Sequence, residues 1–100
     1  MSHRKERFSS TLKQCLADIM LVEMNNPLFK SVFITKVETA DDLKKAWVFV
    51  SSLSIAGPGD IEPMIAELTK AKGFIKRSLA KRMVLKYVPD LVFIYEGNGK

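Results

Sequence analysis

The sequence predicts a small α+β domain in which helices pack on a three-stranded sheet. Two kinds of apolar pattern lead to this prediction. Apolar residues recur every three or four positions near the N-terminus and again over residues 61–83, as they do on one face of a helix. Three shorter segments, at 31–38, 43–53 and 91–95, are rich in the β-branched and aromatic residues that favour strands. The expected order is therefore helix, strand, strand, helix, helix, strand.

The first helix is expected from about residue 5 to about residue 24. Its apolar side chains are spaced for a single buried face: Phe8, Leu12, Cys15, Leu16, Ile19 and Met20. The segment NNP at 25–27 ends it, because the residue before a proline is pushed out of the helical region. Cys15 is the single cysteine of the chain, so we interpret it as a small buried hydrophobe and expect no internal disulfide.

The first two strands are expected to form an antiparallel hairpin, with Asp41 and Asp42 as turn-forming residues between them. In the second strand Ala46 shares one face with alternate valines, while Trp47 and Phe49 point to the other. Both faces are apolar, so we expect both to be at least partly covered. Trp47 is accordingly predicted to lie in the core rather than to serve as a ligand platform.

The second half of the chain predicts two helical segments separated by a kink. Residues 55–60 form a turn-rich connector, and Asp60 is placed to cap the helix that follows. Ala71 and Gly73 interrupt the apolar stripe, and glycine lets a chain bend and another backbone approach closely. Pro89 is expected to end the helical region before the last strand.

Length and composition favour one soluble domain over residues 1–100, with residues 97–100 as a loose tail. The chain has 100 residues, of which 47% are hydrophobic and 27% charged. No apolar run approaches the roughly 18 residues of a membrane span, and no apolar segment follows the basic start as it would in a secretory signal. We therefore expect a cytoplasmic protein without a membrane partner.

The positive charge is unevenly distributed along the chain. The formal net charge is +5, and residues 70–86 contain seven Lys or Arg and no acidic residue. In the second helical segment Phe74, Arg77 and Lys81 share a face opposite Ile75 and Leu79. Backbone N–H groups at a helix start attract phosphate, so the pattern indicates a nucleic-acid contact. The alternative is a solvated helix surface beside an ordinary glycine kink.

The sequence resembles the ribosome-binding factor A family over nearly its whole length. The resemblance rests on the early Arg4 and Arg7, on NNPLFKSVFITKVETADDLKKAWVFVSSL (25–53) and on AKGFIKRSLAKRMVLKYVPDLVFIYE (71–96). It implies a KH-like fold of the second topology, in which Ala71 and Gly73 belong to an Ala-x-Gly kink that replaces the usual GxxG loop. It also implies a bacterial, non-catalytic factor that binds the small ribosomal subunit and its rRNA during late maturation and supports growth in the cold.

The chain departs from the family pattern at four positions. The family's Asp before the proline is Asn26, the Arg after it is Leu28, and the terminal Asp is Glu96. The Arg of the family's Gly-Phe-Ile-Arg is Lys76, which keeps the charge but loses the bidentate fork of a guanidinium. Because Leu28 replaces an arginine of the family, any contact that the family makes through the turn after Pro27 is not carried over to this chain.

The resulting hypothesis is a monomeric factor whose basic residues contact rRNA phosphates. The predicted contact residues are Arg4, Lys5, Arg7, Lys72, Lys76, Arg77, Lys81, Arg82 and Lys86, with Ala71 and Gly73 as the kink motif. No catalytic residue, cofactor, metal or small-molecule substrate is expected.

Four alternatives compete with this hypothesis. An enzyme is disfavoured because the one histidine, His3, lies near the terminus and no residue cluster has metal-ligand spacing. A generic KH-like RNA-binding module without ribosome specificity stays open, although a chain without GxxG is better suited to a folded RNA surface than to a single strand. A helix-turn-helix is disfavoured because no short polar turn separates the two helical segments of this chain. A protein-only adaptor, whose basic face would meet an acidic partner, stays open.

Overall fold

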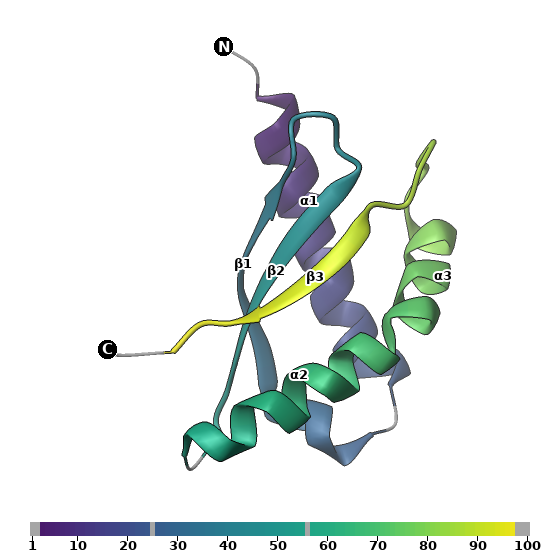
Figure 1. Cartoon of the computed structure of the whole chain (residues 1–100). Helices are drawn as coiled ribbons and strands as arrows, with labels where there is room; N and C mark the ends of the chain where they lie inside the picture. The colour runs from purple at the N-terminus through teal and green to yellow at the C-terminus, as the bar shows by residue number, and fades with distance from the viewer. Residues whose placement is uncertain (1–2, 25, 56, 98–100) are drawn as a thin grey trace.

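The computed structural model describes residues 3–24, 26–55 and 57–97, and it confirms the predicted order of helices and strands (Figure 1). The loose tail predicted at 97–100 lies, apart from Gly97, outside these residues. The elements are α1 (Arg4–Asp18), η1 (Ile19–Glu23), η2 (Pro27–Lys30), β1 (Val32–Thr39), β2 (Lys45–Ser52), η3 (Pro58–Asp60), α2 (Ile61–Lys70), α3 (Lys72–Arg82) and β3 (Asp90–Tyr95).

The sheet has the strand order β1-β2-β3, in which the predicted hairpin is antiparallel and β3 runs parallel to β2. A parallel neighbour needs a long crossover, which α2 and α3 provide. Asp42 forms the hairpin turn as predicted, since its Oδ1 accepts the Lys44 N–H at 3.0 Å. Leu43 takes the left-handed conformation at φ 62°, which costs a residue with a side chain about 1–2 kcal/mol.

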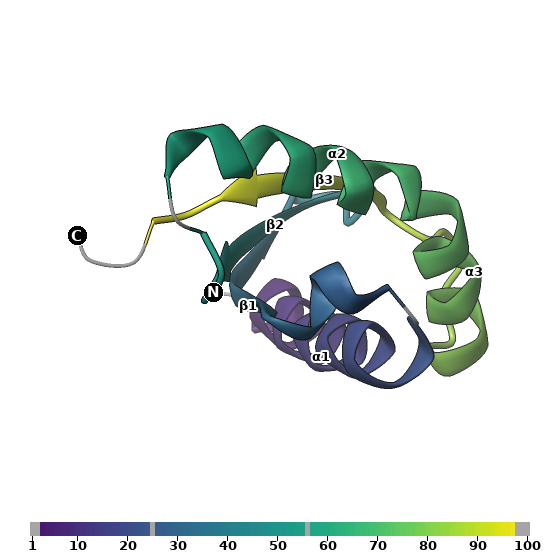
Figure 2. The same ribbon diagram turned by 90° about the horizontal axis from the view of Figure 1, so that it is seen from below.

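The three main helices pack on one face of this sheet, and their side chains share a single apolar core with the strands (Figure 2). Ala46, Val48 and Val50 are the contribution of β2 to the core, and Cys15, predicted to be buried, is half-buried and packs against it. The helices contribute Leu12, Leu16, Ile19, Met64, Leu68, Ile75 and Leu79. This arrangement agrees with the KH-like fold of the second topology that the resemblance implies.

Trp47 lies outside this core, so its predicted place was wrong. It is half-buried on the opposite face of β2, with the Lys45 ammonium 5.6 Å from its ring centroid. An apolar composition on both sides of β2 indicated two covered faces, but among the described elements the helices cover only one. The ammonium of Lys45, and not a packed element of the described structure, lies over the indole ring.

Three helix ends differ in detail from the sequence prediction. The first helix continues past Asp18 as a π turn over Ile19–Glu23. Asp60 precedes α2, but its carboxylate accepts the Gly57 N–H at 3.3 Å instead of capping the helix. The last helix ends at Arg82, where Met83 becomes extended, well before Pro89. No helix among the described residues is long and apolar enough to cross a membrane.

Candidate nucleic-acid interface

The kink between α2 and α3 is centred on Ala71. Its backbone adopts φ −83° and ψ 0°, and its N–H donates to the carbonyl oxygens of Glu67 and Leu68 at 3.1 Å. The Ala71 carbonyl then accepts the N–H of Ile75 at 2.9 Å. Backbone hydrogen bonds therefore continue across the bend from α2 into α3, and the predicted helix–kink–helix is confirmed.

Gly73 is the second residue of α3 and has more space than predicted. A methyl group at its Cα would meet the Nη1 of Arg77 at 3.6 Å, an ordinary van der Waals contact. Among the described residues, and apart from its own helix and chain neighbours, no other heavy atom comes within 4 Å of that position. Its φ is not in the left-handed region. The expected close approach of another backbone of this chain was therefore wrong, and internal packing does not require glycine here.

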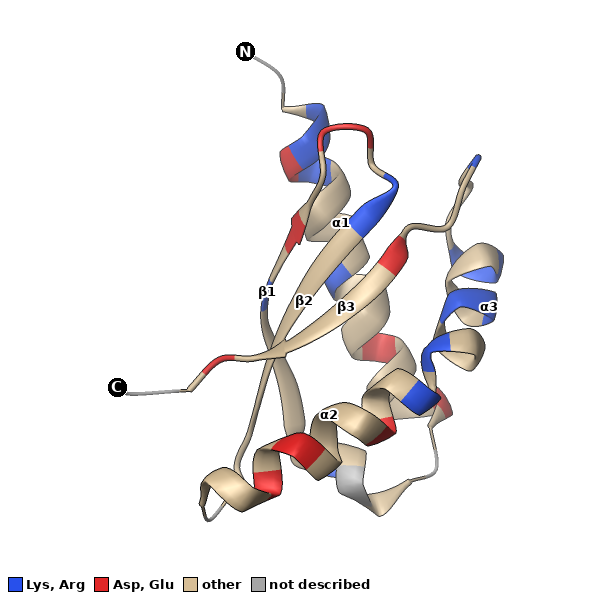
Figure 3. Ribbon diagram, in the orientation of Figure 1, with Lys and Arg blue, Asp and Glu red and all other residues tan. Residues whose placement is uncertain are grey.

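Helix α3 carries basic residues along its length (Figure 3). Arg77 and Lys81 are exposed, and Phe74 is 38% exposed, whereas Ile75 and Leu79 are fully buried. Within the described ranges, neither Arg77 nor Lys81 forms an ion pair with a carboxylate. These two cations are therefore available to an anion from outside the chain.

Other predicted contact residues already have a carboxylate of this chain nearby. Lys72 and Lys76 lie 3.6 and 4.0 Å from Oδ1 of Asp90, at the start of β3. The Lys5 ammonium lies 3.0 Å from Oδ1 of Asp41 in the hairpin turn. Such exposed pairs contribute little to stability, so a phosphate can compete for the same ammonium groups.

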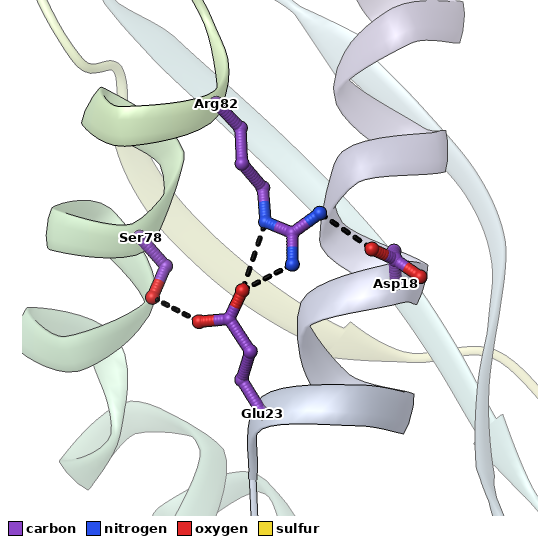
Figure 4. Close-up of polar contacts among 4 residues, drawn as sticks. All are labelled: Asp18, Glu23, Ser78 and Arg82. Carbon is purple, nitrogen blue, oxygen red and sulfur yellow. Dashed lines mark hydrogen bonds and ion pairs between the residues drawn. The ribbon is translucent and has the colours of Figure 1, made fainter.

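Arg82 is held differently from the other cations (Figure 4). Its Nε donates to Oε2 of Glu23 at 3.0 Å, and its two terminal nitrogens make further ion pairs with Glu23 and with Asp18. Ser78 donates its hydroxyl to the other Glu23 oxygen at 2.8 Å. The Arg82 side chain is only 29% exposed. It therefore ties the end of α3 to the π turn and to the end of α1.

This network also fixes the charge of Glu23. The hydrogen bonds from Arg82, followed by the bond from Ser78, lower the pKa of Glu23 below its ordinary value of 4.5. The ionised carboxylate is thus the form that the fold selects. Sequence reasoning missed Glu23 and Asp18, because their contacts with Arg82 span 59 and 64 residues along the chain. The only local signal is Ser78, a polar residue on the buried side of α3.

Arg4 and Arg7 lie beside the far end of α3 and not beside the kink, whereas Lys5 lies at the hairpin turn. Arg7 lines a shallow groove with residues 82–85. Arg4 and Lys86 line a neighbouring cavity of about 390 Å³ together with Phe8. The predicted contact residues thus fall into two groups, one beside the kink and one beyond the C-terminal end of α3, joined by the outward face of that helix.

Comparison with known proteins places this arrangement in a family. The family model for ribosome-binding factor A matches residues 4–99. The chain belongs to the ribosome-binding factor A family. Ribosome-binding factor A of Desulfitobacterium hafniense is 35% identical over 94 residues, which cover 94% of this chain and 74% of the relative. The protein from Macrococcus caseolyticus is 38% identical over 96 residues, which cover 96% of this chain and 82% of the relative.

Solved structures of the family share the fold. The solution structure of a Thermotoga maritima protein assigned to ribosome-binding factor A superposes with a TM-score of 0.82 at 26% identity, covering 100% of this chain and 93% of that one. The crystal structure of the Thermus thermophilus factor gives 0.77 at 22% identity, covering 91% and 93%. A Thermus thermophilus model fitted into a cryo-EM map of a 30S complex gives 0.69 at 21% identity, covering 86% and 88%. The KH-like fold is thereby confirmed.

The interface contains no arrangement typical of metal chemistry. Among the described residues, no three His, Cys, Asp or Glu side chains gather closely enough to hold a metal ion. This surface carries positive charge beside an open backbone at Gly73. Such a combination can accept an anionic polymer.

Proposed function

We propose that this chain binds the maturing small ribosomal subunit by contacting phosphates of its rRNA. One observation carries the proposal: α3 presents Arg77 and Lys81, which form no ion pair within the described part of the chain, beside an open glycine in a member of the ribosome-binding factor A family. The Thermus thermophilus protein fitted into the map of a 30S complex supports the choice of partner. The role is assistance to late maturation of small-subunit rRNA and to growth in the cold.

The proposed contact surface consists of both groups of cations. Its residues are Arg4, Lys5, Arg7, Lys72, Lys76, Arg77, Lys81 and Lys86. Arg82, also predicted as a contact, enters the proposal as the residue that holds α3 in position, because two carboxylates already surround its guanidinium. Lysine and arginine neutralise phosphates without reading bases, so the shape of the folded RNA supplies the specificity.

Gly73 has a defined part in this function. Because neither its own backbone conformation nor the packing around it requires glycine, its bare Cα is best explained by something that approaches from outside. An RNA backbone resting on the kink is such a neighbour, and a side chain at position 73 would push it away. The chain acts in this role as one monomeric cytoplasmic domain, with no catalytic step, cofactor or small-molecule substrate.

Co-sedimentation with isolated small subunits, large subunits and free structured RNA tests the proposal. The double variant Arg77→Glu with Lys81→Glu should lose retention on small subunits at physiological salt. The matched control is Lys13→Glu with Lys30→Glu, which changes the net charge equally but lies outside the proposed surface. The slope of the logarithm of the binding constant against the logarithm of the salt concentration should become shallower by about 1.4–1.8, because each of the two lost phosphate contacts accounts for roughly 0.7–0.9.

Two outcomes contradict the proposal. If the double variant and its control lose retention equally, net charge and not this surface governs binding. If the chain sediments equally with large subunits and free RNA, it is a generic KH-like RNA-binding module without ribosome specificity.

A further inference from the structure

A second cavity lies where three separate segments meet beyond the end of α3. The start of α1 contributes Arg4 and Phe8, the β1–β2 turn contributes Asp42 and Leu43, and the loop after α3 contributes residues 84–87. The cavity has a volume of about 390 Å³. This is near the lower end of the range of about 300–1,000 Å³ that small-ligand sites occupy.

An exposed aromatic ring surrounded by cations forms one side of this cavity. Tyr87 is 54% exposed. The ammonium groups of Lys44 and Lys86 lie 5.1 and 5.8 Å from its ring centroid, and Arg4 lines the same space. The lining contains one acidic residue, Asp42, whose Oδ1 accepts the backbone N–H of Lys44, and the cations around the ring outnumber it. The surroundings of the ring therefore favour a ligand that combines a planar ring with negative charge.

Two apolar residues also line this cavity. One of them, Leu43, has φ at 62°, a conformation that glycine or asparagine adopts more readily. Val84, which lines the same space, is fully exposed to solvent. A strained leucine and an unshielded valine next to an aromatic ring indicate a surface that is covered in the bound state.

We propose that this cavity holds one unpaired ribonucleotide. The base lies against the Tyr87 ring and the apolar wall of Leu43 and Val84, while Lys44, Lys86 and Arg4 surround its phosphate. The inference rests on the proposed RNA-binding function and adds a second mode of contact to it. The kink takes the backbone of folded RNA, whereas the cavity takes a base that is free of pairing, because a stacked and paired base cannot expose its face.

The two contacts are separated along the chain by α3. Its 11 residues span about 16 Å of helix. Arg77 and Lys81 lie on that helix between the kink and the cavity. One RNA strand leaving a helical region could thus follow this face and end with its unpaired nucleotide at Tyr87. The loop after α3 would then distinguish RNA with a nearby unpaired base from RNA that is wholly paired.

Titration of the intact chain with single-stranded hexauridylate and hexaadenylate, followed by amide NMR, tests this inference. Signals of Leu43, Val84 and Tyr87 should shift, and a blunt RNA duplex of the same length should leave them unchanged. Tyr87→Ala should weaken hexamer binding roughly 5- to 150-fold, and Tyr87→Phe should retain it, because stacking needs only the ring. Lys86→Glu should also weaken binding, through the phosphate.

Phe33→Ala is the matched control, because Phe33 is similarly exposed on β1 but does not line this cavity. It should leave hexamer binding unchanged. The inference is overturned if the hexamers shift only residues near Gly73, if the duplex shifts the cavity equally, or if Tyr87→Ala binds as tightly as the unaltered chain. Retention of the unaltered chain on small subunits in that case would leave the proposed function intact, so the two failures are distinguishable.

Discussion

Replacing Gly73 with alanine separates the stability of the chain from its function. Glycine near the start of a helix loses more conformational freedom on folding than alanine does. The new methyl group would meet only the Nη1 of Arg77 at 3.6 Å, which is comfortable contact at the end of a flexible side chain. Gly73→Ala should therefore make the fold more stable by about 0.5–1 kcal/mol.

Thermal unfolding followed by circular dichroism measures this gain. In a domain of 100 residues, 1 kcal/mol changes Tm by about 4–8 °C, so the expected increase is roughly 2–8 °C. Ala80→Gly, at an exposed position later in the same helix, is the matched control and should lower Tm by a similar amount. In the co-sedimentation assay Gly73→Ala should bind small subunits more weakly, while Ala80→Gly should bind normally wherever it is folded.

A lower Tm for Gly73→Ala would refute the reasoning about packing, because it would mean that the fold itself needs glycine at this position. A higher Tm with unchanged subunit binding would refute the functional part. The glycine would then be a neutral feature of the kink, and the external contact would have to lie elsewhere on α3.

Three further predictions concern the surroundings of this helix. The pKa of Glu23 is lower in the folded chain than in the unfolded chain. The stability that this carboxylate contributes is therefore present above pH 4.5, its ordinary pKa, and is lost as the pH falls through the lowered pKa. Glu23→Gln should remove this part of the fall in Tm when Tm is measured over a series of acidic pH values. Asp90→Asn should change stability by less than about 1 kcal/mol yet strengthen subunit binding, because it frees Lys72 and Lys76 from a competing carboxylate. Leu79→Ala should cost about 2–5 kcal/mol in denaturant unfolding, since Leu79 is fully buried.

The order of elements could be predicted because each element carries its own apolar period. Leu12 and Leu16 lie one helical turn apart, and both are fully buried. Alternate residues of β2 are buried as a half-buried strand requires. The kink could be placed from a local signal, since Gly73 is a poor helix former and stands beside the small Ala71 between the two apolar stripes. Local patterns of this kind need no knowledge of distant segments.

Features that depend on distant segments could not be predicted in the same way. Which face of the sheet the helices cover is decided by the crossover, so the apolar character of Trp47 did not reveal that it lies outside the core. The π turn at Ile19–Glu23 brings Glu23 next to α3, and no periodicity in the sequence requires it. The cavity around Tyr87 is assembled from three segments that are separated by more than thirty residues each.

The charges of α3 illustrate the same limit at the level of single residues. Arg77 and Arg82 have identical chemistry and stand five residues apart, which places them about 140° apart around the helix. One guanidinium faces solvent without a carboxylate partner in the described structure, and the other is bound by Glu23 and Asp18. Counting basic residues assigns both to the RNA. The structure separates a residue that can bind phosphate from one that holds the binding helix in place, and only the first should change the salt dependence of subunit binding.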